Sequence, residues 1–356
     1  MRKYILDFDQ LSKASLPMVG GKNASLGELI NAGISVPPGF AVTTEGYNRF
    51  LEEAGIRKKM FSLLAGIDVA DTDSLDSNSA RVRELIESAP ISSEVEENIR
   101  ESYASLCDRC GVKDMPVAVR SSATAEDLPT ASFAGQQDTY LWVRTSGEAM
   151  KNIRRCWASL FTSRAIAYRI KNKFPHEKVL ISVGIQKMVN SKAAGVMFTI
   201  DPLNGDPSRV VIEGNWGLGE TVVAGHVNPD KFVVDKVLLE ISERRVSHKH
   251  VECIFDHARE EVVEAETPSE ISDLPCLENR EIMELVKLAK RIEDHYGSPQ
   301  DIEWAIDKDL TFPDNTFIVQ SRPETVWSQR MQRSVIGKKS AHELLMERAM
   351  RITRVH

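Results

Sequence analysis

Cysteine is scarce in this chain, and long hydrophobic runs are missing. The five cysteines among 356 residues are an odd and sparse set, which is typical of a protein in a reducing compartment and argues against a disulfide-stapled secreted domain. No apolar stretch follows Met1, and no segment approaches the length that crosses a bilayer. We therefore expect a cytoplasmic protein that is neither exported nor inserted into a membrane.

A surplus of positive charge is also missing, except near the C-terminal end. The net charge is −7, while residues 326–356 hold seven Lys or Arg against two Glu, so residues 1–325 carry −12. An acidic body argues against binding to nucleic acid, whose phosphates require a broad basic surface. Residues 341–354 place apolar side chains on one stripe of a predicted helix and most charges on the other side. This pattern indicates a helix that docks a partner.

Two common nucleotide-binding signatures are absent. The glycine-rich segment 214–220 does not spell a dinucleotide-binding fingerprint. Gly21 and Lys22 do not complete a P-loop, because no Ser or Thr follows the lysine. These absences exclude two widespread nucleotide-binding folds.

The most informative segment is residues 117–141. Residues 117–120 predict a short strand that brings the guanidinium of Arg120 to a sheet edge, and hydroxyl side chains follow it. A planar guanidinium can bind two phosphate oxygens at once. From this segment alone, an ion pair of Arg120 with Glu126 or Asp127 on a solvated turn is an equally good interpretation.

A second cation lies at the start of a predicted helix. Residues 20–32 predict a helix with Lys22 in its first turn. The free N–H groups and the macrodipole of a helix N-terminus attract anions, and Lys22 adds a point charge there. The segment therefore favours a phosphate-binding role.

Two predicted strands in the last third of the chain carry oxygen donors. Residues 301–307 alternate like a half-buried strand, and residues 317–323 predict a second strand. Glu303 and Gln320 are hard oxygen donors on these neighbouring strands, a pair that suits Mg²⁺ held against a polyphosphate. Arg322 lies two residues beyond Gln320 and shares its face of the strand.

Further candidates could form the remaining parts of a nucleotide site. The strand at 181–189 offers an apolar slot for adenine, with Met188 packing against the ring, although the residues alone favour a plain core strand. Glu220 can accept from ribose hydroxyls or form a surface salt bridge. Small residues around Gly135 let backbone N–H groups approach phosphate and leave freedom for closure, and Thr139 can donate to phosphate.

Taken together, these segments resemble the ATP-grasp nucleotide-binding domain of the dikinase family, which includes phosphoenolpyruvate synthase, pyruvate phosphate dikinase and rifampicin phosphotransferase. The resemblance extends from about residue 19 to residue 322. It depends on motifs in the order of the family: GGKNASLGE, VRSSATAEDLP, SFAGQQDTYL, the strand around Gln186, DPLNG, GLGE, DIEWAID and IVQSRP. It implies an α+β ATP-grasp fold of two lobes with the nucleotide cleft between them, ATP and Mg²⁺ as cofactors, and Gln186 close to the nucleotide.

Phosphoryl transfer requires positioning and charge neutralisation more than a protein nucleophile. We assign the catalytic roles to Lys22, Arg120 and Arg322, with Mg²⁺ on Glu303 and Gln320. The full set of expected ATP-binding residues is Lys22, Arg120, Gly135, Thr139, Gln186, Met188, Glu220 and Arg322.

The expected organisation is an N-terminal lobe at residues 1–180, a C-terminal lobe at residues 181–325 and a basic tail at residues 326–356. Within the first lobe, residues 68–79 are polar enough to predict a linker. Residues 147–171 predict a single helix with apolar side chains at roughly helical spacing.

The family enzymes also use a swinging domain with a phosphorylated histidine, usually in a Thr-Ser-His setting, and a barrel that binds the final acceptor. None of the eight histidines here has that setting. We therefore expect a separate subunit to carry the histidine and the barrel. The resemblance then implies a phosphotransferase of the dikinase type that needs this partner and releases AMP and phosphate.

Three interpretations of the activity follow. Phenylphosphate synthase resembles a dikinase split into subunits, and this first choice implies phenol as the acceptor. The ATP-binding part of a split or truncated phosphoenolpyruvate synthase is the alternative. A non-catalytic nucleotide sensor is the third, and the intact set of cations and oxygen donors argues against it. The choice of acceptor depends on analogy, because no segment of this chain is expected to contact it.

Overall fold

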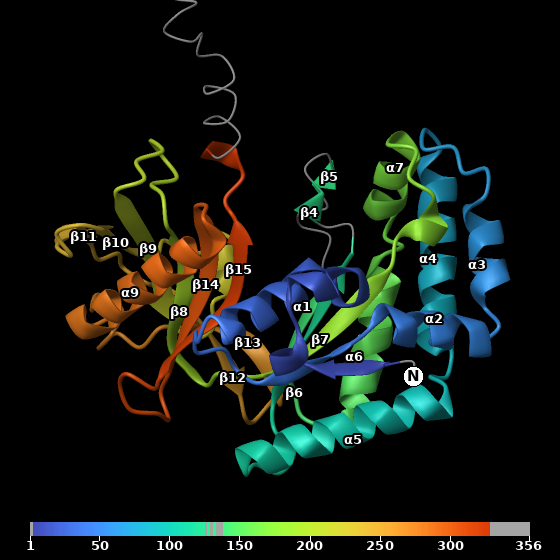
Figure 1. The fold of residues 1–356 in the computed structure, drawn as a ribbon, viewed down its shortest axis with the longest axis horizontal. Helices are drawn as coiled ribbons and strands as arrows, with labels where there is room; N and C mark the ends of the chain where they lie inside the picture. The colour runs from blue at the N-terminus through green and yellow to red at the C-terminus, as the bar shows by residue number, and fades with distance from the viewer. Residues whose placement is uncertain (1–2, 125–126, 129–130, 133–137, 328–356) are drawn as a thin grey trace, which may run out of the picture.

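The chain forms a mixed α/β structure built on two antiparallel sheets of five and six strands, with two further two-stranded pairs among the described residues. Figure 1 shows the two large sheets next to each other, each with its own helices. The computed structural model describes residues 3–124, 127–128, 131–132 and 138–327.

The five-stranded sheet has the strand order β1-β2-β7-β3-β6, and all of its neighbouring strands are antiparallel. The strands β2, β7 and β3 are almost completely buried, and β-branched side chains are frequent in β7 and β3, as expected for a pleated surface that is covered on both faces. The strands are β1 (Ile5–Asp7), β2 (Gly39–Val42), β7 (Ile181–Lys187), β3 (Val117–Ala123) and β6 (Thr139–Val143).

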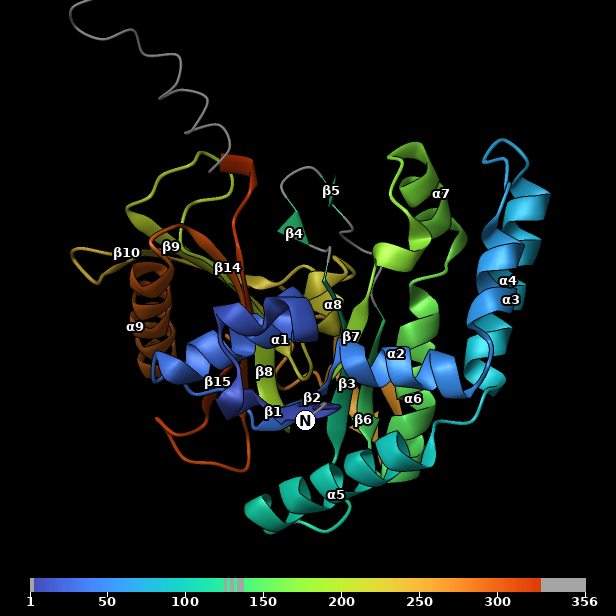
Figure 2. The same ribbon diagram turned by 45° about the vertical axis from the view of Figure 1, so that its right-hand side comes forward.

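The helices α2 to α7 cover this sheet and share one hydrophobic core with it. Trp157 lies at the centre of this core, fully buried, and stacks on Phe50 with 4.6 Å between the ring centroids. Figure 2 shows α4, α6 and α7 on the side of the sheet that faces away from the six-stranded sheet. The helices are α2 (Thr44–Glu53), α3 (Arg57–Leu64), α4 (Thr72–Ser88), α5 (Ser93–Cys110), α6 (Ser146–Ser159) and α7 (Ser163–Lys171).

The six-stranded sheet has the order β11-β10-β9-β8-β14-β15. Helix α9 (Asn279–Tyr296) packs on it through apolar residues at helical spacing, including Ile282, Leu285 and Ile292, which are fully buried in a second core. The strands are β8 (Ser191–Phe198), β9 (Arg209–Trp216), β10 (Asp230–Asp235), β11 (Ile241–Arg245), β14 (Gln300–Asp307) and β15 (Thr316–Pro323).

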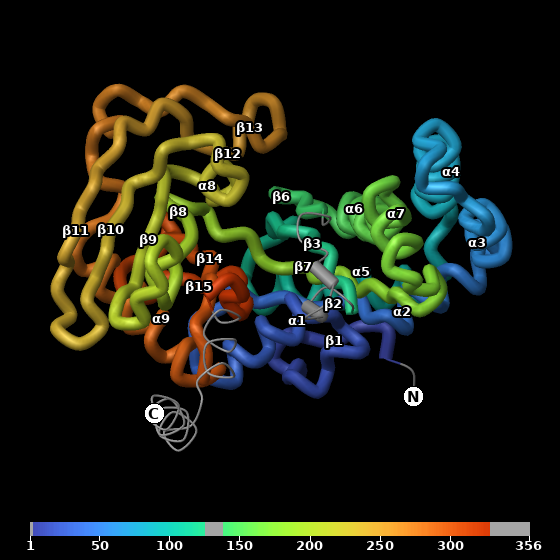
Figure 3. Tube along the Cα trace, turned by 90° about the horizontal axis from the view of Figure 1, so that it is seen from above, coloured from blue at the N-terminus to red at the C-terminus, as the bar shows by residue number. Residues whose placement is uncertain are grey.

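We call the five-stranded sheet with its helices the first unit and the six-stranded sheet with its helix the second unit. A hairpin of β12 (Val251–Asp256) and β13 (Glu261–Glu266) extends from the second unit to the first. Phe255 on this hairpin stacks on Trp142 of β6, with 4.8 Å between the ring centroids and 13° between the planes. Figure 3 shows the hairpin extending toward β6. The smaller pair, β4 (Asp127–Leu128) with β5 (Ala131–Ser132), follows β3.

Trp327, the last described residue, is held against the turn between β8 and β9. Its Nε1 donates to the carbonyl oxygen of Pro202 at 2.9 Å. The indole lies so close to Gly205 that a Cβ on this glycine would be 2.6 Å from the ring. The chain after β15 therefore leaves the second sheet at a fixed place.

Strand β7 needs a correction, because we expected it to open the C-terminal lobe. It pairs with β2 and β3 in the first sheet, and Met188 still donates its N–H to Pro116 of that unit at 2.9 Å. The next strand, β8, belongs to the other sheet. The boundary between the two units thus lies after β7.

The predicted linker and the predicted single helix also differ from the structure. Helix α4 begins at Thr72, where Asp71 caps it by accepting from the N–H of Ser74 at 3.0 Å. Its first residues are polar because they face solvent. The helix predicted at 147–171 is two helices, since Thr162 caps α7 by accepting from the N–H of Ala165.

No helix in the described part of the chain is both long and apolar enough to span a bilayer. All five cysteines are free thiols. Gly135 and the helix predicted at 341–354 lie outside the described residues, so their predicted roles remain untested.

Candidate functional site

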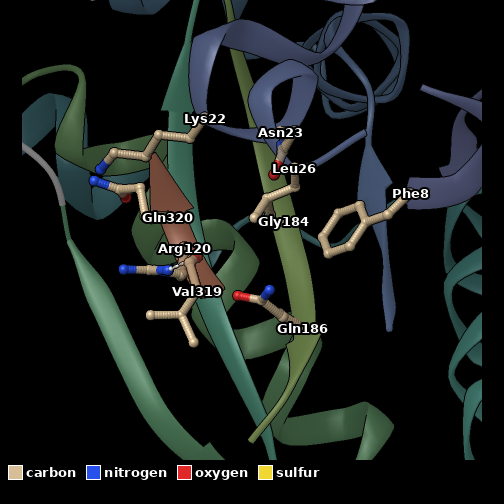
Figure 4. A pocket seen from close by; sticks show the side chains of 9 residues that line it. All are labelled: Phe8, Lys22, Asn23, Leu26, Arg120, Gly184, Gln186, Val319 and Gln320. Atoms are coloured by element: carbon tan, nitrogen blue, oxygen red, sulfur yellow. Dashed lines mark hydrogen bonds between the residues drawn. The ribbon is translucent and has the colours of Figure 1, made fainter. Parts of the chain in front are cut away.

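A small pocket lies where the two sheets meet (Figure 4). It brings together four of the residues predicted for the nucleotide site, from α1 (Leu16–Asn31), β3, β7 and β15. Its lining residues are Phe8, Lys22, Asn23, Leu26, Arg120, Gly184, Gln186, Val319 and Gln320.

Lys22 reaches this pocket because α1 is broken at Gly20. The glycine has a φ of 71°, and a Cβ there would lie 2.3 Å from the carbonyl oxygen of Ser122 on β3. Only glycine fits this close approach at a left-handed φ. The helix resumes after the break, so Lys22 occupies its first turn, and the N–H of Asn23 donates to the Ser122 hydroxyl at 3.4 Å.

Arg120 joins the two sheets. It lies on β3, its Nη1 donates to the carbonyl oxygen of Val319 at 2.9 Å, and its Nη2 pairs with Glu303 Oε2 at 2.8 Å. Both side chains are mostly buried, with 18% and 20% of their surface exposed. The buried Nε of Arg120 has no hydrogen-bond acceptor among the described residues, so this N–H of the guanidinium remains able to donate a further hydrogen bond.

Glu303 and Gln320 are direct neighbours across β14 and β15. The amide nitrogen of Gln320 donates to Glu303 Oε1 at 3.1 Å, so each oxygen of the carboxylate accepts one bond, the other coming from Arg120. The predicted adjacency of the two strands is therefore present. An oxygen-rich pair of this kind is compatible with a hard divalent cation.

Asp301 is the site residue that sequence reasoning missed. It lies two positions before Glu303 on β14, so both carboxylates are on the same face of the strand. Burial raises the pKa of Asp301, while the charge of Arg322 lowers it. The alternation of residues 301–307 contained this signal, because the face that carries Glu303 also carries Asp301.

Arg322 bonds to Asp301 through Nε at 2.8 Å and Nη2 at 2.7 Å. More than half of its side chain is exposed (56%), and it is not among the residues that line the pocket. The structure thus places this predicted phosphate ligand at the edge of the site, against a carboxylate.

The other predicted residues are distributed around the pocket. Gln186 is buried on β7 and lines the pocket, with its Nε2 3.4 Å from the carbonyl oxygen of Pro37. Thr139 on β6 is the register partner of Arg120. Met188 follows β7 and is absent from the pocket lining.

Glu220 begins the short helix α8 (Glu220–Val223) and is exposed at its surface. The surrounding protein still raises the pKa of its carboxyl by desolvation, the charge of Arg120 lowers it, and Glu264 raises it. The guanidinium of Arg120 is therefore close enough to act on this carboxylate.

Known proteins are similar to this chain over most of its length. The family model for the pyruvate phosphate dikinase AMP/ATP-binding domain matches residues 16–343. The chain belongs to this family. The match includes every strand of the two large sheets except β1, so the ATP-binding domain of the family corresponds to nearly the whole described chain.

Relatives in archaea carry the name phosphoenolpyruvate synthase. A probable phosphoenolpyruvate synthase of Staphylothermus marinus is 49% identical over 95% of this chain and 43% of its own length. A probable phosphoenolpyruvate synthase of Methanothermobacter thermautotrophicus is 44% identical, with 94% and 48% covered. The phosphoenolpyruvate synthase of Aeropyrum pernix is 43% identical, with 93% and 43% covered. The chain thus spans less than half the length of these relatives.

Proposed function

We propose that this chain is the ATP-binding part of a dikinase of the phosphoenolpyruvate synthase type. In this reaction a nitrogen of a histidine outside the chain attacks the β-phosphorus of ATP. The nitrogen–phosphorus bond forms as the bond from the β-phosphorus to the AMP oxygen breaks, and AMP leaves. Water then attacks the γ-phosphorus, the bond between this phosphorus and the β,γ-bridging oxygen breaks, and phosphate leaves, so one phosphoryl group stays on the histidine. The observation that carries the proposal is the convergence of Lys22, Arg120, Gln186 and Gln320 on one pocket, with Glu303 bonded to two of them.

The chemistry of these residues supports a triphosphate ligand. Lys22 offers a compact charge at a helix N-terminus, and Arg120 offers a planar fork with a buried Nε still available. Two cations, one at the start of the resumed helix α1 and one on β3, would neutralise phosphate charge, which is the main requirement of phosphoryl transfer. The two sheets would then be the two lobes of an ATP-grasp fold, with the pocket at the inner end of the cleft between them.

The donor set also fits Mg²⁺. Glu303 and Gln320 would hold the ion, with Asp301 next to them on β14. In the described residues no three His, Cys, Asp or Glu side chains form a complete metal cage, and Mg²⁺ commonly takes one or two carboxylates and completes its shell with phosphates and water. When bound, the ion would neutralise charge on the phosphates.

For the acceptor, the names of the relatives favour pyruvate over phenol, our first choice from the sequence. We also propose that the phosphorylated histidine lies on a partner, either a separate subunit or a further domain. Support for a carrier outside this chain is that the chain covers less than half the length of each of these relatives.

The proposal can be tested with the histidine-bearing part of the Aeropyrum pernix relative. The chain is mixed with Mg²⁺ and ATP, with and without that part, and AMP is measured, followed by addition of pyruvate or phenol. We expect AMP only with both parts, and product only with pyruvate. ATP binding without any AMP would instead indicate a nucleotide sensor, and product from phenol would reverse the choice of acceptor.

A further inference from the structure

Helix α1 carries Lys22 and lies between the two sheets, as the views in Figures 1 and 2 agree. Asn23 bonds the start of the resumed helix to the first sheet. The N–H of Asn23 donates to Ser122 on β3, and its Nδ2 donates to the Ser182 hydroxyl on β7 at 3.1 Å. The kinked end of the helix is therefore anchored to the first sheet beside the pocket.

Ser25 ties the same helix to the second sheet. Its hydroxyl donates to the carbonyl oxygen of Ser321 at 2.8 Å, and Ser321 lies directly after Gln320 on β15. The Tyr296 hydroxyl, at the end of α9, is 3.0 Å from the same Ser25 oxygen. A serine hydroxyl has one proton, and a carbonyl can only accept. Tyr296 is therefore the donor in its contact with the Ser25 hydroxyl, and its proton also lies within reach of the Ser25 carbonyl oxygen at 3.4 Å. The shorter bonds form a relay from Tyr296 through Ser25 to Ser321.

The end of α9 also holds the rest of α1. His295, next to Tyr296 in the chain, pairs with Glu28 at 3.0 Å. Arg291 donates to the carbonyl oxygens of Ala32 at 3.0 Å and Gly33 at 3.2 Å. Contacts of α1 and the two residues after it with β15 and α9 thus extend from Ser25 to Gly33, and of these the relay is the one closest in sequence to Lys22.

We propose that Ser25 and Tyr296 are positioning residues for Lys22. Their hydroxyl relay fixes the helix that carries Lys22 against the strand that carries Gln320, and so sets the distance between the lysine and the metal-binding pair. Ser25 lies three residues after Lys22, slightly less than one helical turn, so a shift of the helix at Ser25 is transmitted to the lysine. This inference rests on the proposed nucleotide site.

The test compares binding of ATP and of AMP, with Mg²⁺, by isothermal titration calorimetry. Ser25→Ala removes both bonds of the relay, and we expect ATP to bind roughly three- to tenfold more weakly, the equivalent of one or two hydrogen bonds. AMP should change by less than about twofold, because it lacks the outer phosphates that Lys22 would hold. Tyr296→Phe should have a smaller effect, and Ser25→Thr, which retains a hydroxyl, should restore binding.

A double-mutant cycle with Lys22→Ala separates positioning from general damage. If Ser25 acts through the lysine, Ser25→Ala should change ATP affinity by less than about twofold once Lys22 is absent. Tyr103→Phe is the matched control, since that hydroxyl donates to the carbonyl oxygens of Met115 and Arg144 in the first unit. We expect it to lower stability without changing ATP affinity.

Two outcomes would overturn the inference in different ways. Additive effects of Ser25→Ala and Lys22→Ala, or equal losses for ATP and AMP, would overturn the positioning role alone while the wild-type chain still binds ATP. A wild-type chain that binds no ATP would overturn the proposed function and this inference together.

Discussion

The guanidinium of Arg120 donates to the Glu303 carboxylate at 2.8 Å, which connects β3 of one sheet to β14 of the other. The proposed phosphate ligand and the proposed metal ligand are thus bonded to each other. If a phosphate replaces Glu303 as the partner of the Arg120 guanidinium, the Glu303 carboxylate becomes free to bind a cation. The two binding events should therefore support each other.

We expect Arg120→Ala to weaken ATP binding by about 10- to 100-fold, because hydrogen bonds to charged groups contribute about 1.5–3 kcal/mol. Arg120→Lys should give an intermediate affinity, since it retains the charge but loses the planar fork. Titration calorimetry measures both, with circular dichroism to confirm folding. The control is Arg100→Ala, whose partner Glu96 lies one turn away on the exposed face of α5. Wild-type affinity in Arg120→Ala would contradict the assignment.

Gly20→Ala should destabilise the chain by more than about 3 kcal/mol, because it combines a left-handed backbone with a backbone clash against Ser122. Gly55 has a similar φ of 65° but open space around it. Gly55→Ala should therefore cost only about 1–2 kcal/mol. Urea unfolding of the two variants tests this, and equal losses would show that the approach to Ser122 is unimportant.

Stability should depend on pH through His176. Burial, reinforced by the charge of Arg169, lowers the pKa of His176 to about 4 from 6.5, and the Arg169 Nε donates to its Nδ1 at 2.9 Å. As the pH falls below 6.5, the unfolded chain takes up a proton that the folded chain rejects. Stability should therefore fall by on the order of 2–3 kcal/mol down to about pH 4.

His176→Gln should remove this part of the pH dependence, as measured by urea unfolding between pH 7 and pH 4. His226→Gln, at an exposed position beside Glu264, serves as the comparison for the loss of an exposed imidazole. If the His176 variant and the wild type show the same slope, the buried imidazole does not titrate in this range.

The stack of Trp142 on Phe255 should couple the stabilities of the two units. A double-mutant cycle of Trp142→Ala and Phe255→Ala is expected to give a coupling energy of about 0.5–1.5 kcal/mol. The control is a cycle of Trp142→Ala and Phe312→Ala. The Phe312 ring faces Arg280, so the effects of these two substitutions on the free energy of unfolding should be additive. An uncoupled Trp142–Phe255 pair would mean that the hairpin is not held against β6.

Local chemistry made part of the site predictable. The start of the helix at Lys22 follows from the two glycines before it, and the pairing of Glu303 with Gln320 follows from two alternating strands in sequence. The bond from Arg120 to Glu303 joins residues 183 positions apart, so no local pattern contains it. The sequence therefore predicts which side chains belong to the site, but it does not predict that Arg120 bonds to Glu303.

The missed features have a common physical cause. The pairing of Arg322 with Asp301 on the neighbouring strand was not predicted, because it depends on the register that places the two residues opposite each other; the phosphate role of Arg322 stays a prediction. Likewise β7 joins the first sheet through partners that precede it by many residues. Strand order and cross-strand pairing depend on tertiary packing, which a single sequence does not display.

Trp327 gives the end of the described chain a fixed position. Because its indole packs against Gly205 and bonds to Pro202, the residues after β15 are held against the turn between β8 and β9. If the carrier of the proposed function is attached after this residue, its linker starts from a fixed point, and its reach toward the pocket depends on the length and stiffness of that linker. Trp327→Ala would release this anchor and should then slow transfer to such a carrier.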